Sequence, residues 1–291
     1  MGQELILGTV QFGLNYGVAN KTGQINEEEA SKILDIAFSS GIKTLDTAIA
    51  YGDSERILGK LNRDRFELIT KLPGLPKDCS SPDLWVKRSI EESLERLRIP
   101  KIKALLLHDI SVLFGEFGNE VYTRIRHFID EGKIEKFGVS IYSYRDLDRI
   151  PDFVQYDILQ APFSVFDQSL LKSGYTERLR SRGVIVQARS IFLQGLLLMK
   201  IHERPKYFDR WKSHFRLWDD WRKTQIYEPL EACIKFVQSV SDISQVVFGV
   251  DSSTQLNQIL SIFKDQREII FPSYLSSEDE NLIFPSKWNL S

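Results

Sequence analysis

Short, almost continuous apolar runs alternate along the chain with longer stretches whose apolar residues recur every three or four positions. The longer stretches have the spacing of amphipathic helices. The short runs have the character of strands that are buried on both faces of a parallel sheet. Eight of them are predicted to be strands, at residues 5–10, 43–47, 66–71, 103–109, 136–140, 157–161, 184–189 and 245–250.

Glycines and capping residues mark the ends of the predicted helices. A glycine follows three of the helical stretches, because it adopts the left-handed backbone of a helix C-terminus without a steric penalty. These glycines are Gly41, Gly132 and Gly183. Asn26, with Glu29 three residues later, has the spacing of a capping box and predicts a helix start.

The alternation of strands and helices predicts the fold. Eight strand–helix units in 291 residues favour a (β/α)8 TIM barrel, formed by a single domain over residues 1–291. A doubly wound sheet would have about six strands and a glycine-rich first turn, and the segment GTVQFGLNYG lacks that motif. Two segments exceed a minimal barrel: a long insertion after strand seven, residues 191–228, and a C-terminal tail, residues 271–291.

Charge and composition narrow the classes of partner. With 38 basic and 40 acidic residues, the net charge is -2, which gives no reason to expect nucleic acid or a membrane surface. Cys79 and Cys233 lie far apart and match no metal-ligand spacing, as is usual in the reducing cytoplasm. The N-terminal sequence has no signal-peptide pattern. We expect a cytoplasmic monomer or small homo-oligomer without a metal site.

Ionisable side chains stand at the ends of three consecutive predicted strands. Asp46 ends the second strand and Tyr51 follows in its loop, Lys71 ends the third strand, and His108 ends the fourth. Active sites of TIM barrels lie at these carboxyl ends, and neighbouring strands are about 4.8 Å apart. We therefore expect the four side chains to converge.

These four residue types suit the protonation of a carbonyl group. A phenol has a pKa of about 10, and a buried ammonium beside it is expected to lower that value. Asp46 would keep Lys71 charged, and a neutral His108 would orient the carbonyl oxygen. Taken singly, His108 and Tyr51 more often have structural roles, and Asp46 and Lys71 could equally well form a structural ion pair. Burying two charges at one face, however, costs several kcal/mol and favours a functional reason for the joint set. The hydride for such a reduction must come from elsewhere.

The motifs around these residues resemble those of the aldo-keto reductase superfamily over essentially the whole chain. LDTAIAYGDSERILG, residues 45–59, is similar to the family's Asp…Tyr-Gly segment, LITKL supplies the lysine, and LLLHD supplies the histidine. The resemblance implies that the catalytic tetrad is Asp46, Tyr51, Lys71 and His108, with Tyr51 as proton donor. It implies reduction of an aldehyde or ketone to an alcohol by a nicotinamide cofactor.

The resemblance also implies a set of cofactor-binding residues, with two departures. Ile141 stands where the family has asparagine, and Arg189 stands where a tyrosine stacks on the nicotinamide; a guanidinium plane can also stack on a ring. The implied set is Thr9, Ser140, Gln160, Arg189, Ser190, Gln194, Gly249, Ser252, Ser253, Gln255 and Gln258.

The adenosine end of the cofactor differs most from the family pattern. Gly249 and Val250 replace a lysine and a serine that grip the 2′-phosphate of NADPH, and Gln255 replaces an arginine. The helix start at Ser252 and Ser253 is expected to hold the anion instead. Family membership keeps NADP(H) as the expected cofactor, with weak discrimination and real use of NAD(H).

The insertion has two interpretations. Residues 206–223 space aromatic side chains at helical intervals, as in an amphipathic helix packed on the barrel. Alternatively they form a substrate lid, whose excess of four positive charges over residues 200–223 would favour an anionic or sugar-like carbonyl substrate.

Two other functions stay open on the sequence alone. The first is a non-catalytic or slow nicotinamide-nucleotide-binding regulatory module, a role that members of the family also have. The second is a barrel hydrolase or isomerase that uses Asp46 and His108, although this would leave Lys71 and Tyr51 without roles.

Overall fold

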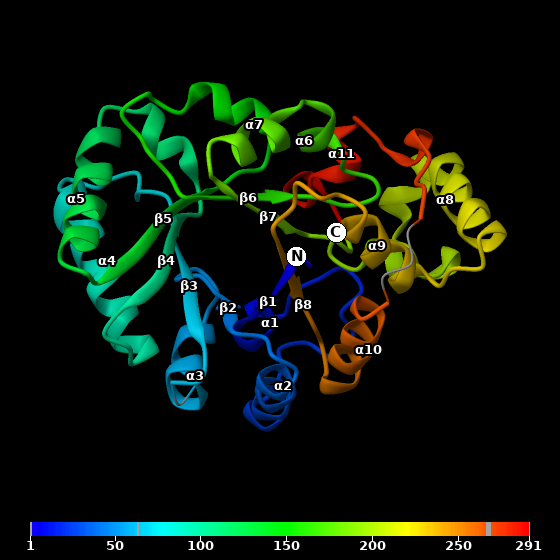
Figure 1. The fold of residues 1–291 in the computed structure, drawn as a ribbon, viewed down its shortest axis with the longest axis horizontal. Helices are drawn as coiled ribbons and strands as arrows, with labels where there is room; N and C mark the ends of the chain where they lie inside the picture. The colour runs from blue at the N-terminus through cyan, green and yellow to red at the C-terminus, as the bar shows by residue number, and fades with distance from the viewer. Residues whose placement is uncertain (1, 63, 266–268, 291) are drawn as a thin grey trace.

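In this computed structural model, residues 2–62, 64–265 and 269–290 are described. Within them, eight parallel strands close into a barrel in chain order (Figure 1). The strands are β1 (Glu4–Gly8), β2 (Thr44–Asp46), β3 (Glu67–Leu72), β4 (Ile102–Leu107), β5 (Ile134–Ser140), β6 (Ile158–Pro162), β7 (Ile185–Arg189) and β8 (Gln245–Gly249). Each strand overlaps one predicted apolar run, so the (β/α)8 TIM-barrel prediction is confirmed.

Helices surround the barrel on its outside (Figure 1). The longer ones are α2 (Glu27–Ser39), α3 (Ser54–Leu61), α4 (Pro82–Leu97), α5 (Gly118–Asp130), α7 (Tyr175–Ser181), α9 (Pro229–Gln238) and α10 (Ser253–Phe263). Helix α2 begins as predicted, because the Asn26 side chain accepts a hydrogen bond from the Glu29 backbone N–H at 2.9 Å. Gly41 has the expected positive φ of 85° after this helix. In the described parts of the chain, no helix has the length and apolar character to cross a membrane.

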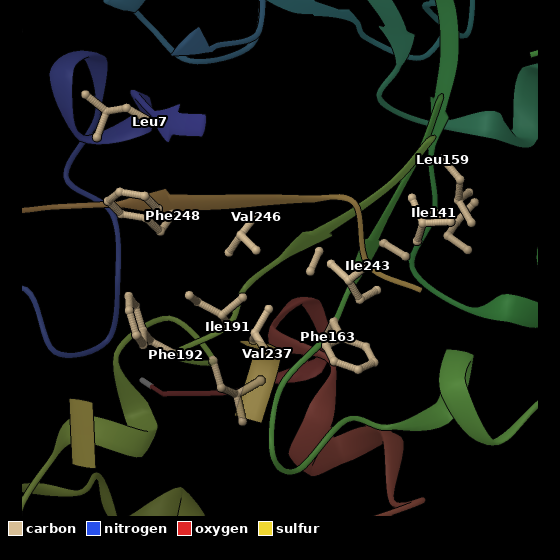
Figure 2. Close-up of a cluster of buried hydrophobic side chains, with 14 of the residues drawn as sticks. Leu7, Ile141, Leu159, Phe163, Ile191, Phe192, Val237, Ile243, Val246 and Phe248 are labelled. Atoms are coloured by element: carbon tan, nitrogen blue, oxygen red, sulfur yellow. The ribbon is translucent and has the colours of Figure 1, made fainter. Parts of the chain in front are cut away.

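Two hydrophobic cores share the same strands. Successive side chains of a strand point to opposite faces, so Ile6 and Leu106 belong to a small cluster inside the barrel. Their neighbours Leu7 and Leu105 belong to the large cluster between the barrel and the helices. Figure 2 shows part of this outer core, where Phe248 of β8 and other side chains from several strands and loops gather. Because the two cores pack on both faces of each strand, they hold in place the carboxyl ends of the strands, where the site lies.

The insertion and the C-terminal tail pack against each other. The insertion contains η3 (Leu196–Leu198), η4 (Ile201–Glu203), η5 (Lys206–Trp211) and α8 (Lys212–Thr224), and the tail contains η6 (Ser273–Leu275), α11 (Glu280–Ile283) and η7 (Pro285–Lys287). The rings of Phe208 and Trp288 meet edge to face at 4.9 Å, and Trp211 Nε1 donates to Asp279 at 2.9 Å. The tail is therefore held in place by the insertion.

Candidate active site

A buried ion pair forms the centre of the predicted tetrad. Lys71 Nζ lies 2.5 Å from Asp46 Oδ1 and donates a second hydrogen bond to the Thr47 carbonyl oxygen at 2.9 Å. Asp46 is 3% exposed and Lys71 is 1% exposed. Gln160 Nε2 donates to the other Asp46 oxygen at 2.8 Å. Because both charges are removed from water, removal of either partner would leave an uncompensated buried charge.

Tyr51 and His108 lie beside this ion pair. Their rings meet edge to face with centroids 5.6 Å apart, and Lys71 Nζ lies 5.1 Å from the centre of the Tyr51 ring. Asp46, Tyr51, Lys71 and His108 all line one cavity. The four side chains that were expected to converge therefore lie together in one cavity at the strand ends.

Two glycines allow the loop that carries Tyr51 to approach helix α1 (Val10–Gly13). A Cβ at Gly13 would lie 1.8 Å from the Tyr51 carbonyl oxygen, and a Cβ at Gly52 would lie 2.4 Å from the Gly13 carbonyl oxygen. Gly52 also has a positive φ of 53°. Any larger residue at Gly13 would displace the backbone of Tyr51, so this contact positions the phenol.

The protonation states follow from burial and from the neighbouring charges. Burial lowers the pKa of His108 to about 4, and Lys71 and Arg189 contribute in the same direction, so the imidazole is neutral at pH 7 as predicted. Burial raises the pKa of Tyr51, the Asp46 carboxylate adds to this rise, and Arg189 opposes it. The prediction that Tyr51 has a lowered pKa is therefore wrong, because Asp46 balances the charge of Lys71 and leaves desolvation dominant.

The cavity at the strand ends, called here the strand-end cavity, has a volume of about 420 Å³. It contains eight of the eleven predicted cofactor-binding residues. These are Thr9, Ser140, Gln160, Arg189, Ser190, Gln194, Gly249 and Gln255. Ser252, Ser253 and Gln258 are not among the described residues that line it.

Gln160 and Arg189 are held by hydrogen bonds on the wall of the cavity. Gln160 Nε2 donates to Asp46 Oδ2 and to Gln187 Oε1, at 2.8 and 3.0 Å, whereas the buried Gln160 Oε1 has no donor among the described residues. Arg189 Nη2 donates to the Ile141 carbonyl oxygen at 2.9 Å, and its guanidinium lies over the Tyr142 ring at 4.9 Å. Thus the backbone of Ile141, which stands where the family has asparagine, orients Arg189, which stands where the family has tyrosine.

The start of α10 does not offer the anion site that the sequence predicted at Ser252 and Ser253. The Ser253 backbone N–H donates to Glu29 Oε1 of α2 at 2.6 Å. Ser252 accepts from the Gln255 backbone N–H at 3.2 Å and caps the helix in the usual way. A carboxylate therefore already accepts a hydrogen bond at the positive helix end where the sequence predicted a phosphate contact.

Several residues of the cavity wall were not predicted from the sequence. Tyr16 lines the cavity and its hydroxyl accepts from Gln194 Nε2 at 3.2 Å. Gln11, Asp251 and Pro285 also line it. Only the position of Asp251, two residues after the end of β8, carried a signal in the sequence. The other three lie on α1, on the loop that follows it, or in the tail, and tertiary packing alone brings them to the strand ends.

The structure favours the packing interpretation of residues 200–223 over the lid interpretation. None of these residues is among the described side chains that line the strand-end cavity. Trp218 is 0% exposed and Phe208 is 2% exposed. Asp219 pairs with both Arg204 and Arg222, at 3.0 and 3.3 Å, so part of the positive charge is neutralised within the segment.

Comparison with known proteins places this site in a family. A family model described as "Aldo/keto reductase family" matches residues 4–269. An L-galactose dehydrogenase from Arabidopsis thaliana is 26% identical over 303 residues, which cover 97% of this chain and 92% of the relative. A 6-dehydroglucose reductase from Novosphingobium aromaticivorans is 29% identical over 143 residues, or 43% of this chain and 46% of the relative.

A solved structure has the same fold. An aldo-keto reductase from Bacillus halodurans, in its holo form, superposes with a TM-score of 0.72 at 20% identity and covers 92% of this chain and 88% of its own. The match of the family model over most of the chain, together with the barrel and the four convergent side chains, leads to one assignment. The chain belongs to the aldo/keto reductase family.

Proposed function

We propose that this protein reduces an aldehyde or ketone to an alcohol, with a proton from Tyr51 and a hydride from a nicotinamide nucleotide. The observation that carries the proposal is the buried Asp46–Lys71 pair beside Tyr51 and His108 in one cavity. Packing alone gives little reason to bury such a pair, because the desolvation of two charges offsets their attraction. A carbonyl that gains a hydride needs a proton donor at its oxygen, and this cluster supplies one.

The described residues of the cavity fit a dinucleotide. Gln160 Oε1 and Asp251 Oδ1 are buried acceptors to which no described residue donates, and a nicotinamide nucleotide carries amide N–H and ribose O–H donors that match them. Ser140 and Gln160 would hold the carboxamide, and Gln11 and Asp251 would hold groups at the β8 end. When bound, the reduced nicotinamide supplies the hydride.

The remaining chemistry belongs to the side chains. His108, neutral at pH 7, donates an N–H to the carbonyl oxygen and orients it. Tyr51 transfers its proton to that oxygen as negative charge develops there. The raised pKa of Tyr51 keeps the phenol protonated at neutral pH, as a general acid must be, and the Lys71 ammonium lies near the phenolate that results. Alcohol oxidation requires the phenolate first, so we expect its rate to rise with pH.

The proposed substrate class is a sugar-like carbonyl compound. Both relatives named above act on sugars according to their names. The cavity wall offers the hydroxyl groups of Tyr16 and Tyr142, which can hydrogen-bond to sugar hydroxyls. The positive charge of residues 200–223 is not needed for this choice of substrate class, since none of these residues is among the described lining of the cavity.

The test is a panel of sugar aldehydes, simple aldehydes and ketones, with either NADH or NADPH, followed by the absorbance of the reduced nicotinamide. Turnover of at least one compound supports the proposal. Cofactor binding without any turnover would favour a nucleotide-binding regulatory module. The absence of both cofactor binding and turnover would contradict the proposal and would favour hydrolase or isomerase chemistry at Asp46 and His108.

A further inference from the structure

Positive charge is confined to one part of the strand-end cavity. Lys71 and Arg189 are the only lysine or arginine side chains among the described residues that line it. Both act on the pKa of His108, so both lie at the catalytic end. The lining at β8 consists of apolar and neutral polar groups and one carboxylate, Asp251.

A second carboxylate lies just outside this end of the cavity. Glu29 accepts the Ser253 backbone N–H at 2.6 Å, and this bond lowers the pKa of Glu29, so the group is ionised at neutral pH. Lys32, a nearby cation on the same helix, pairs with Glu28 at 2.7 Å. The N-terminus of α10 therefore presents a carboxylate to an incoming phosphate.

Asp251 has a free acceptor that points to a ligand with hydroxyl groups. Within the described parts of the chain, its buried Oδ1 has no hydrogen-bond donor, and its backbone N–H donates to Gln255 Oε1 at 2.7 Å. The Gln11 side chain lies against Gly249, where a Cβ would approach Gln11 Oε1 to 2.5 Å. Asp251, Gln11 and Gln255 form a small group at the β8 end, called here the β8 acceptor group, in which Asp251 Oδ1 and Gln11 Oε1 have no donor among the described residues.

We propose that the β8 acceptor group and Glu29 make this protein select NADH over NADPH. The inference rests on the proposed function, which requires the nicotinamide at Tyr51 and leaves the β8 end for the adenosine. A ribose hydroxyl donates to Asp251 Oδ1. A 2′-phosphate, which carries about -1.5 to -2 charge, meets no lysine or arginine among the described lining residues at this end and meets two carboxylates instead. This preference departs from the NADP(H) expected from the sequence.

The test measures binding, independently of turnover. Dissociation constants of NADH and NADPH are determined by fluorescence titration of the wild-type protein and of Glu29→Gln, Asp251→Asn and Glu28→Gln. Wild type is expected to bind NADH at least about tenfold more tightly, the size of a modest like-charge repulsion. Glu29→Gln and Asp251→Asn are each expected to reduce that ratio about threefold or more, chiefly by tightening NADPH binding.

Glu28→Gln is the matched control, since it removes the same charge from the same helix turn but from an exposed side chain paired with Lys32. It should leave the ratio unchanged, whereas added salt should narrow the wild-type ratio by screening the repulsion. Equal affinities, or tighter binding of NADPH by wild type, would overturn this inference and leave the proposed function intact. If neither cofactor binds, the proposed function fails as well.

Discussion

The two ends of the strand-end cavity differ in how their charges are arranged. At the catalytic end, Asp46 and Lys71 neutralise each other at 2.5 Å and are almost inaccessible to water. At the β8 end, the Glu29 carboxylate accepts a hydrogen bond from the Ser253 backbone N–H, and Asp251 Oδ1 accepts none from the described residues. The charges of the catalytic end therefore form a closed, neutralised pair, and its unpartnered acceptor is the uncharged Gln160 Oε1, whereas the unpartnered acceptor of the β8 end belongs to a carboxylate, as far as the described residues show.

This difference separates two kinds of function. A closed network of buried charges sets protonation states and holds reacting groups in place, so its disruption should affect stability and rate. An incomplete set of acceptors discriminates between ligands, so its alteration should affect affinity. Substitutions at the two ends are thus expected to give different signatures, and the following variants test that separation.

Lys71→Met should have the largest effect on stability. It leaves Asp46 buried and unpaired, which typically costs about 3 to 5 kcal/mol in the free energy of unfolding. Urea denaturation measures this loss, and the double variant Asp46→Asn/Lys71→Met should regain part of it without regaining activity. Glu29→Gln, at the other end, should cost only about 1 kcal/mol. Equal losses for Lys71→Met and Glu29→Gln would contradict the contrast between the two ends.

His108 should make stability depend on pH. Its pKa is about 4 in the folded protein and about 6.5 when unfolded, so the unfolded chain binds the extra proton first as pH falls. Stability linked to this group should be complete above pH 6.5 and lost between about pH 6.5 and 4, by at most about 3 kcal/mol. His108→Asn should remove this loss in denaturation curves taken across the range. The exposed His202→Asn serves as control, and an unchanged pH dependence in His108→Asn would refute the assignment.

Gln255→Ala should have the smallest effect of these variants, and it should change only the affinity for the cofactor. It removes the 2.7 Å hydrogen bond that holds the Asp251 backbone, a loss of about 1 kcal/mol. The dissociation constant of the preferred cofactor should rise about fivefold, whereas kcat at saturating cofactor stays unchanged. Titration and steady-state kinetics on the same preparation measure both quantities. A fall in kcat with unchanged affinity would show that the two ends are not functionally separate.

The same contrast explains what the sequence was able to predict. All eight strands were predictable because continuous apolar runs reflect burial on both faces. The convergence of Asp46, Lys71 and His108 followed, since the order of strands around a parallel barrel fixes which strand ends are neighbours. The strand order of the barrel was sufficient for this prediction, and no other long-range contact was needed.

The β8 end was less predictable because its properties depend on helix packing. Glu29 was recognised only as a capping-box residue of α2, yet its carboxylate accepts from Ser253, 224 residues later. Likewise, Pro285 reaches the cavity because the tail packs on the insertion. The pKa of Tyr51 was mispredicted because residue identity gives the neighbouring charges but not the degree of desolvation.

Tyr51→Phe tests the central claim, that Tyr51 donates the proton for carbonyl reduction, most directly. Single-turnover reduction of the best substrate from the panel should slow by about 10²- to 10⁴-fold, the usual contribution of a general acid. Cofactor affinity should be unchanged, and Tyr274→Phe, at an exposed tyrosine, should behave as wild type. A Tyr51→Phe protein that folds, binds cofactor and reduces the substrate at the wild-type rate would contradict the account.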